Sequence, residues 1–283
     1  MSQKSYSNNK PTVYLIPTPI GNMEDITVRA LNVLKNVEVI FSEDTRVTRQ
    51  LLNHFDINKK LISSHNFNEN SNENILLKYL NDDKDVGIVT DRGTPIISDP
   101  GYELVKIAIK NDFNVVSLPG ATALIPALTS SGLNPSPFTF YGFLNSKDSK
   151  QKKELDELKN LSSTLIFYEA PHRIIKTLGN IKEVFGNRKI SISREISKKF
   201  EEVYRGTIEE VISELTEVKG EFVIVVDGNH EEKKYDNITV IEHVNLYIKE
   251  GYKTMDAIKM VAKERNVNKN EIYNEYHGGN KWN

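Results

Sequence analysis

Short apolar runs alternate with stretches of helical periodicity along the first half of this 283-residue chain, and this alternation constrains the fold more than any other feature. β-branched and aromatic residues mark the expected strands, and polar loops connect them to the helices at short spacing. Strands that alternate with helices in this way form a parallel sheet covered by helices. The expected strands of this sheet lie at residues 13–16, 37–41, 61–64, 86–89 and 114–118.

The stretch 86–102, VGIVTDRGTPIISDPGY, begins as the fourth of these strands and continues as an unusual loop. Loops at the carboxyl ends of parallel strands are where open α/β sheets bind their ligands. A simple turn needs one or two glycines and a proline, whereas residues 91–101 hold two aspartates, two glycines and two prolines. The pattern therefore indicates backbone groups that are presented to a ligand.

A second series of strands and helices follows, and the end of the chain has a different sequence pattern. Aromatic and β-branched runs predict strands at residues 138–143, 164–168, 189–192 and 221–226, with helices between them, one of them near 207–216. Beyond residue 231 only helical periodicity remains, at 240–249 and 254–265. We expect an α/β protein with domains at residues 11–122 and 123–230 and a helical tail at 231–283.

Composition excludes several classes of protein. The formal net charge is -2, so an RNA partner would need a local basic face, because free nucleic-acid binders usually carry a basic excess. The chain has no cysteine, which excludes disulfides and thiolate metal sites, and no cluster of histidines and acids predicts another metal site. No apolar run approaches the roughly 20 residues of a spanning helix, and the polar amino terminus does not resemble a secretory signal. We expect a cytoplasmic protein with no metal and no membrane partner.

Two common nucleotide-binding motifs are missing. No GxGxxG sequence follows a strand and no Walker sequence occurs, which disfavours a Rossmann dehydrogenase and a P-loop enzyme. The segment PTPIGN at residues 17–22 follows the first strand, and it fits equally well a rigid turn into a helix and a ligand-binding loop.

Charged residues follow the second and third strands. Glu43, Asp44 and Arg46 fit a helix cap with a local ion pair as well as a reactive group. His65 and Glu69 lie in the next loop, where a single histidine is more often a hydrogen-bonded loop residue than a base.

The second half of the chain offers two further charged segments. Glu169, His172 and Arg173 follow the strand at 164–168 and again place charge at a strand end. Lysines gather in the segment SKDSKQKK at residues 146–153, which is most often a solvated face and is also the densest basic patch for phosphate.

Together these loops resemble the tetrapyrrole-methylase superfamily of S-adenosylmethionine-dependent methyltransferases, and within it the ribosomal RNA small subunit methyltransferase I branch. The order and spacing of the matching segments make the resemblance specific, and they span nearly all of both α/β domains. The segments are PTPIGNMEDITVRAL at 17–31, SEDTR at 42–46, DRGTPIISDPGYELV at 91–105, LPGATA at 118–123, FYEAPHR at 167–173 and FEEVYRGT at 200–207.

The resemblance implies an activity, a cofactor and partners. It implies a homodimer that methylates the ribose 2'-hydroxyl of a cytidine in the decoding region of 16S rRNA, on naked RNA or within the small ribosomal subunit. It also implies that S-adenosylmethionine is held in a cleft between the two α/β domains.

The resemblance and the charged loops together assign roles to individual residues. Asp44 and Glu169 are the candidates for a base that takes the hydroxyl proton, with Glu69 and His65 in reserve. The expected cofactor-facing residues are Pro19, Ile20, Gly21, Thr94, Pro95, Ile97, Gly120, Thr122, Ala123 and Tyr168. The expected RNA-binding residues are Arg46, Arg49, Arg92, Lys150, Lys152, Lys153 and Arg173.

The sequence departs from the family pattern at two places. Arg92 stands where the pattern usually has alanine, and Ala121 and Thr122 replace the usual Pro-Ser after Gly120. Backbone contacts tolerate both changes, but Arg92 raises the question of how open the crevice is.

Two other functions compete with RNA methylation. One is another activity of the superfamily, the methylation of a tetrapyrrole ring or of a modified histidine on a protein. The other is a ribosome-binding or assembly factor that keeps the fold and has lost the chemistry. The SEDTR and FYEAPHR segments favour the RNA branch.

Overall fold

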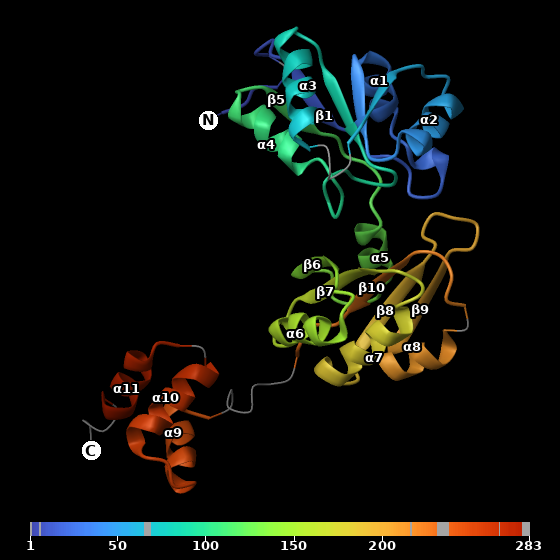
Figure 1. The fold of residues 1–283 in the computed structure, drawn as a ribbon. Coiled ribbons are helices and arrows are strands. Elements are labelled where there is room, and N and C mark those ends of the chain that lie inside the picture. Colours follow the sequence, from blue (N-terminus) through green and yellow to red (C-terminus); the bar gives the residue numbers. More distant parts are fainter. Residues whose placement is uncertain are drawn as a thin grey trace. The chain divides into compact units, whose positions relative to one another are not determined.

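The structure is a computed structural model that describes residues 2–5, 7–64, 69–215, 217–230, 238–265 and 267–278. Two compact units make up the chain, Met1–Asn229 and His230–Asn283. The first unit holds two five-stranded sheets, and the second is helical (Figure 1). None of the helices in the described part of the chain combines the length and the apolar character that crossing a membrane requires.

The first sheet is parallel throughout, as the alternating pattern predicted, with the strand order β3-β2-β4-β1-β5. Each strand lies within two residues of its predicted position. The strands are β1 (Thr12–Leu15), β2 (Val39–Ser42), β3 (Lys60–Ser63), β4 (Val86–Val89) and β5 (Asn114–Ser117).

Helices cover both faces of this sheet because its strands are apolar on both sides. The face that includes Val13 and Leu15 packs against α3 and α4, and the face that includes Ile40 packs against α1 and α2. Thr27 caps α1 and Asp44 caps α2, each with a side-chain oxygen that accepts a backbone N–H of the first turn. These elements are a short 3₁₀ helix η1 (Met23–Asp25), α1 (Val28–Asn36), α2 (Thr45–His54), α3 (Glu69–Asn81) and α4 (Tyr102–Lys110).

The second sheet is mixed, with the order β6-β7-β10-β8-β9. Only β6 and β7 are parallel, and the other neighbours are antiparallel. The strands are β6 (Phe138–Phe143), β7 (Thr164–Glu169), β8 (Lys189–Arg194), β9 (Glu202–Thr207) and β10 (Phe222–Val226).

The two faces of the second sheet are covered unequally. Alternate side chains such as Phe167 and Ile224 pack against α6, α7 and α8, whereas the opposite face, including Ile166 and Val225, packs against α5. The helices are α5 (Leu124–Ser130), α6 (Asp148–Leu158), α7 (Ile174–Phe185) and α8 (Ile208–Glu214). The helix α5 directly follows the segment that leaves the first sheet (Figure 1).

The described residues of the second unit form three helices around a core of its own, which includes Val244, Ile258 and Ile272. These helices are α9 (Val240–Lys249), α10 (Thr254–Arg265) and α11 (Lys269–Gly278). Two of them were predicted, and α11 was not.

The sequence prediction was also wrong at other elements. The strand β9 was missed, because the segment 200–207 was considered only as a motif of the family. The sequence pattern predicts a helix around residues 74–80, whereas the helix α3 begins five residues earlier, at Glu69. The division of the first unit into domains at residue 122 stays a prediction.

Candidate functional site

The loops that leave the carboxyl ends of β1, β4 and β5 meet at one edge of the first sheet and are joined by hydrogen bonds. Thr18 and Gly93 exchange two backbone bonds, each with a nitrogen–oxygen distance of 2.9 Å. The hydroxyl of Thr94 donates to the carbonyl oxygen of Ala121 at 3.0 Å. The three predicted ligand loops therefore form one rigid surface.

The loop after β4 holds residues in backbone conformations that side chains rarely adopt. Ile96 has a φ of 77° and Ser98 a φ of 68°, and Gly93 and Gly101 also have positive φ. A positive φ is costly for a β-branched residue, and such strain persists only where the surrounding structure imposes it. This observation supports the prediction that residues 91–101 are built to present groups to a ligand.

The second sheet presents an aromatic wall. Phe143 at the end of β6 and Tyr168 near the end of β7 lie edge to face, with ring centroids 5.6 Å apart. Because β10 runs antiparallel to β7, its first residue, Phe222, pairs with Glu169 at the end of β7. The start of β10 and the ends of β6 and β7 therefore lie next to one another in the second sheet.

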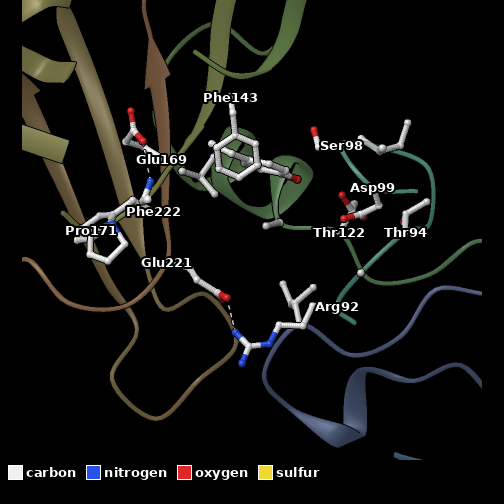
Figure 2. Close-up of a pocket in the computed structure, with 17 residues that line it drawn as sticks. Arg92, Thr94, Ser98, Asp99, Thr122, Phe143, Glu169, Pro171, Glu221 and Phe222 are labelled. Atoms are coloured by element: carbon white, nitrogen blue, oxygen red, sulfur yellow. Dashed lines mark hydrogen bonds and ion pairs between the residues drawn. The ribbon is translucent and has the colours of Figure 1, made fainter. Parts of the chain in front are cut away.

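A pocket of about 340 Å³ lies between these loops and this wall. Figure 2 shows Asp99, Thr94 and Thr122 on one side and Phe222 and Pro171 on the other. The lining residues are Ile20, Arg92, Gly93, Thr94, Ile97, Ser98, Asp99, Thr122, Ala123, Phe143, Tyr168, Glu169, Ala170, Pro171, Glu221, Phe222 and Val223.

Among the ionisable groups of the pocket, Asp99 has the pKa that departs most clearly from its ordinary value. Burial raises its pKa to about 6, and the negative charges of Glu43 and Asp91 act in the same direction, against a hydrogen bond from Thr90. Burial likewise raises the pKa of Asp91. A carboxylate that is held among other acids in a partly buried pocket favours a cationic ligand.

Asp44 is a capping residue in this structure. Its carboxylate accepts the Arg46 backbone N–H at 2.8 Å, and one of its oxygens lies 2.6 Å from an Arg46 guanidinium nitrogen. These hydrogen bonds lower the pKa of Asp44 to about 2. An acid this strong is a poor proton acceptor near neutral pH.

Glu169 lines the pocket, but its carboxylate is buried and fully engaged. One oxygen accepts the backbone N–H of Ala170 at 2.7 Å and the Arg173 Nε at 2.8 Å, and the other accepts the Thr177 hydroxyl at 2.5 Å. The Gln151 side chain donates to the same hydroxyl at 3.2 Å and extends the buried network to α6. This geometry favours a role for Glu169 in fixing Arg173.

The two reserve candidates for the base cannot be placed in the site. His65 lies outside the described residues. Glu69 begins α3, but its side chain lies outside the described part of the chain.

Most of the predicted cofactor-facing residues meet in the pocket. Ile20, Thr94, Ile97, Thr122, Ala123 and Tyr168 line it. Pro19 and Gly21 line an adjacent cavity, Gly120 lines a third, and Pro95 is buried without lining any of these three cavities.

The predicted RNA-binding residues fall into three groups. Arg92 lines the pocket, and Arg46 is exposed at the start of α2, where Arg49 donates to the Lys59 carbonyl oxygen at 3.0 Å. Arg173 is paired with Glu169. Of the lysines on α6, Lys150 and Lys153 are exposed, whereas Lys152 is paired with Glu183 at 2.7 Å.

Sequence reasoning missed several pocket residues. Asp99 belongs to the loop that was singled out, but it is not among the predicted site residues. Phe143 ends a predicted strand, and the rule that carboxyl ends of parallel strands meet would have found it. Glu221 precedes a strand, so only the antiparallel pairing of β10 with β7 reveals it.

The family model described as Tetrapyrrole (Corrin/Porphyrin) Methylases matches residues 12–212. A Bacillus subtilis protein named ribosomal RNA small subunit methyltransferase I is 46% identical over 273 residues, which cover 94% of both chains. A Halalkalibacterium halodurans protein of the same name is 44% identical and covers 98% of this chain and 99% of its own length. A shorter Mycoplasmopsis pulmonis protein of that name is 45% identical over 75% of this chain and 96% of its own.

Solved structures share the fold at much lower sequence identity. The Thermus thermophilus uroporphyrin-III C-methyltransferase, complexed with S-adenosylhomocysteine, has a TM-score of 0.55 and 20% identity, over 76% of this chain and 97% of that one. The methyltransferase CobJ has a TM-score of 0.57 and 18% identity, over 78% and 94%. The matching family model and the nearly full-length relatives carry the assignment. This chain belongs to the tetrapyrrole methylase family and, within it, to the group of ribosomal RNA small subunit methyltransferase I.

Proposed function

We propose that this protein is an S-adenosylmethionine-dependent methyltransferase that methylates the ribose 2'-hydroxyl of a cytidine in the decoding region of 16S rRNA. The observation that carries the proposal is the pocket between the two sheets of the first unit, which the predicted ligand loops line in a chain of this family. The shorter relative from Mycoplasmopsis pulmonis indicates that a protein of this group does not need the full length of this chain.

The residues present fit the cofactor. The aromatic wall of Phe143 and Tyr168, together with Ile97, offers apolar surface for an adenine ring. Asp99 supplies a carboxylate for the cationic part of the cofactor, and Thr94 and Thr122 supply polar atoms close by. Gly93, with a φ of 83°, lets the backbone approach a ligand where a side chain would be strained.

The main contribution of the protein to methyl transfer is to position the two reactants. The bound cofactor supplies a methyl group on a sulfonium, and transfer to a hydroxyl oxygen is an in-line displacement that depends on alignment. Loops fixed by the Thr18–Gly93 and Thr94–Ala121 hydrogen bonds hold one side of the site, and the aromatic wall holds the other. Asp44 and Glu169 stay the candidates for a base, and their hydrogen bonds favour positioning as the larger contribution.

Substrate binding is assigned to the cations around the site. We assign Arg46, Arg49, Arg92, Lys150, Lys152, Lys153 and Arg173 to RNA phosphates, and we expect the small ribosomal subunit, in the cytoplasm, to be the substrate. A homodimer is expected from the family resemblance. The formal net charge of -2 fits a folded substrate that is recognised by shape and a few local contacts.

The test maps 2'-O-methyl marks on 16S rRNA from unmethylated small subunits after incubation with enzyme and S-adenosylmethionine. The expected result is one new mark on a cytidine of the decoding region. Subunit binding without any new mark would favour the non-catalytic alternative, and methylation of a tetrapyrrole or protein instead would refute the RNA assignment.

A further inference from the structure

Two cations share one carboxylate at the edge of the pocket. Arg92, in the loop after β4, forms an ion pair with Glu221, which precedes β10 (Figure 2). Lys198, in the segment between β8 and β9, lies with its Nζ 3.0 Å from the other oxygen of Glu221. An anion therefore bridges a cation of the first sheet's loops and a cation of the second sheet's loops.

Lys198 is held firmly in this position. Its side chain is 20% exposed, and its Nζ lies 2.8 Å from Glu195 Oε1. The aliphatic part packs on Gly21, where an added Cβ would lie 2.3 Å from Lys198 Cγ. Only glycine at position 21 leaves room for the lysine in this place.

Glu221, in contrast, is easy to displace. Its side chain is 59% exposed and that of Arg92 is 52% exposed. Exposed ion pairs contribute little to stability, because water and salt compete for both charges. The Glu221 backbone N–H donates to Glu195 Oε1 at 3.0 Å, so the side chain can leave while its backbone stays in place.

The same two cations line a second cavity. This cavity, of about 360 Å³, adjoins the pocket at Arg92 and is lined by Lys198 and by residues of α2, among them Gln50. Its lining includes one carboxylate, that of Asp91, which accepts the backbone N–H of Asp44 at 3.0 Å. Without the Glu221 side chain, Arg92 would lose this ion pair, and Lys198 would keep only its pair with Glu195.

We propose that Arg92 and Lys198 form an oxyanion site in which Glu221 is a placeholder that gives way to an anion of the bound reactants. A carboxylate and a phosphodiester both carry one negative charge and can accept two hydrogen bonds from a guanidinium. The inference rests on the proposed function, which supplies two such anions, an RNA phosphodiester and the carboxylate of S-adenosylmethionine. The placeholder keeps the two cations in position before the reactant binds.

The test measures two affinities for the variants Glu221→Gln, Arg92→Ala and Lys198→Met. The first is the affinity for unmethylated small subunits, with S-adenosylhomocysteine bound so that no transfer occurs, and the second is the affinity for S-adenosylmethionine alone. Methionine preserves the apolar packing of Lys198 on Gly21. The matched control is Glu103→Gln, which removes one charge from an exposed pair with Lys106 on α4.

Glu221→Gln is expected to raise one of the two affinities up to about fivefold. Arg92→Ala and Lys198→Met are expected to lower the same affinity, and Arg92→Ala should abolish the gain when it is combined with Glu221→Gln. If subunit binding is the affinity that responds, the anion is an RNA phosphodiester, and each lost cation should flatten the log–log salt dependence by about 0.7–0.9. If cofactor binding responds, the anion is the cofactor carboxylate.

Two results would overturn the inference. One is that neither affinity rises in Glu221→Gln relative to Glu103→Gln. The other is that both affinities fall, which would make the ion pairs a structural contact between loops. Neither measurement requires methyl transfer, so a failure of the proposed reaction would appear separately, as the absence of a new methyl mark.

Discussion

If Asp99 binds the cofactor as proposed, its raised pKa predicts the direction in which cofactor binding depends on pH. In the free protein this pKa is about 6, because the carboxyl group is partly buried and lies near Glu43 and Asp91. A cationic ligand binds the ionised form and lowers the pKa in the complex. The affinity therefore approaches its maximum as pH rises above 6 and falls as pH decreases through 6.

The size of the effect follows from the fraction of Asp99 that is ionised. At pH 7 that fraction is about 0.9, and at pH 5 it is about 0.09, so the Kd for S-adenosylmethionine should rise about tenfold between these values. Titration calorimetry of the free enzyme at pH 5, 6 and 7, with unfolding monitored at each pH, measures it.

Asp99→Asn provides the decisive comparison. This variant should bind the cofactor more weakly at pH 7, and its Kd should be nearly independent of pH over the same range, because the amide does not titrate. A wild-type Kd that changes by less than about twofold between pH 7 and pH 5 would refute the reasoning. An equal pH dependence in Asp99→Asn would assign the titration to another group.

Three further predictions concern groups around the site. Glu169→Gln should lower the free energy of unfolding by about 3 kcal/mol in urea denaturation, because Arg173 loses its buried partner; a change below about 0.5 kcal/mol would contradict the described network. Gly120→Ala should weaken cofactor binding, since an added Cβ would lie 2.5 Å from Pro17 Cβ; calorimetric affinity equal to wild type would show that the loop adjusts freely. Asp44→Asn should change the single-turnover methylation rate by less than about tenfold, because the pKa near 2 already makes Asp44 a weak base; a loss of about a hundredfold would restore it as the proton acceptor.

The sequence was most informative where local pattern and topology agree. The first sheet was predictable because each strand is a short apolar run and each connection carries a helix. The meeting of the loops after β1, β4 and β5 was predictable, since parallel strands bring their carboxyl ends to one edge, and their role as ligand loops stays a prediction.

The sequence was least informative where the site depends on antiparallel pairing and on burial. Glu221 enters the site only because β10 pairs with β7 in the register Phe222–Glu169, and no local signal reveals that pairing. Asp99 stood in a predicted loop, but its raised pKa results first from burial and then from the charge of Glu43, which is distant in sequence. Glu169 looked like a reactive group at a strand end, and only the structure shows that it accepts three hydrogen bonds and forms an ion pair with Arg173.

The pocket residues are widely separated in sequence, and this separation determines when the pocket can form during synthesis of the chain. The lining runs from Ile20 to Val223, so the pocket cannot close until the last strand of the second sheet has been synthesised and paired. Contacts of such high sequence separation form late in folding, because the loop between them must first be closed. A nascent chain that still lacks β10 therefore lacks the proposed cofactor pocket, and we expect the enzyme to become active only after nearly all of its first unit has been synthesised.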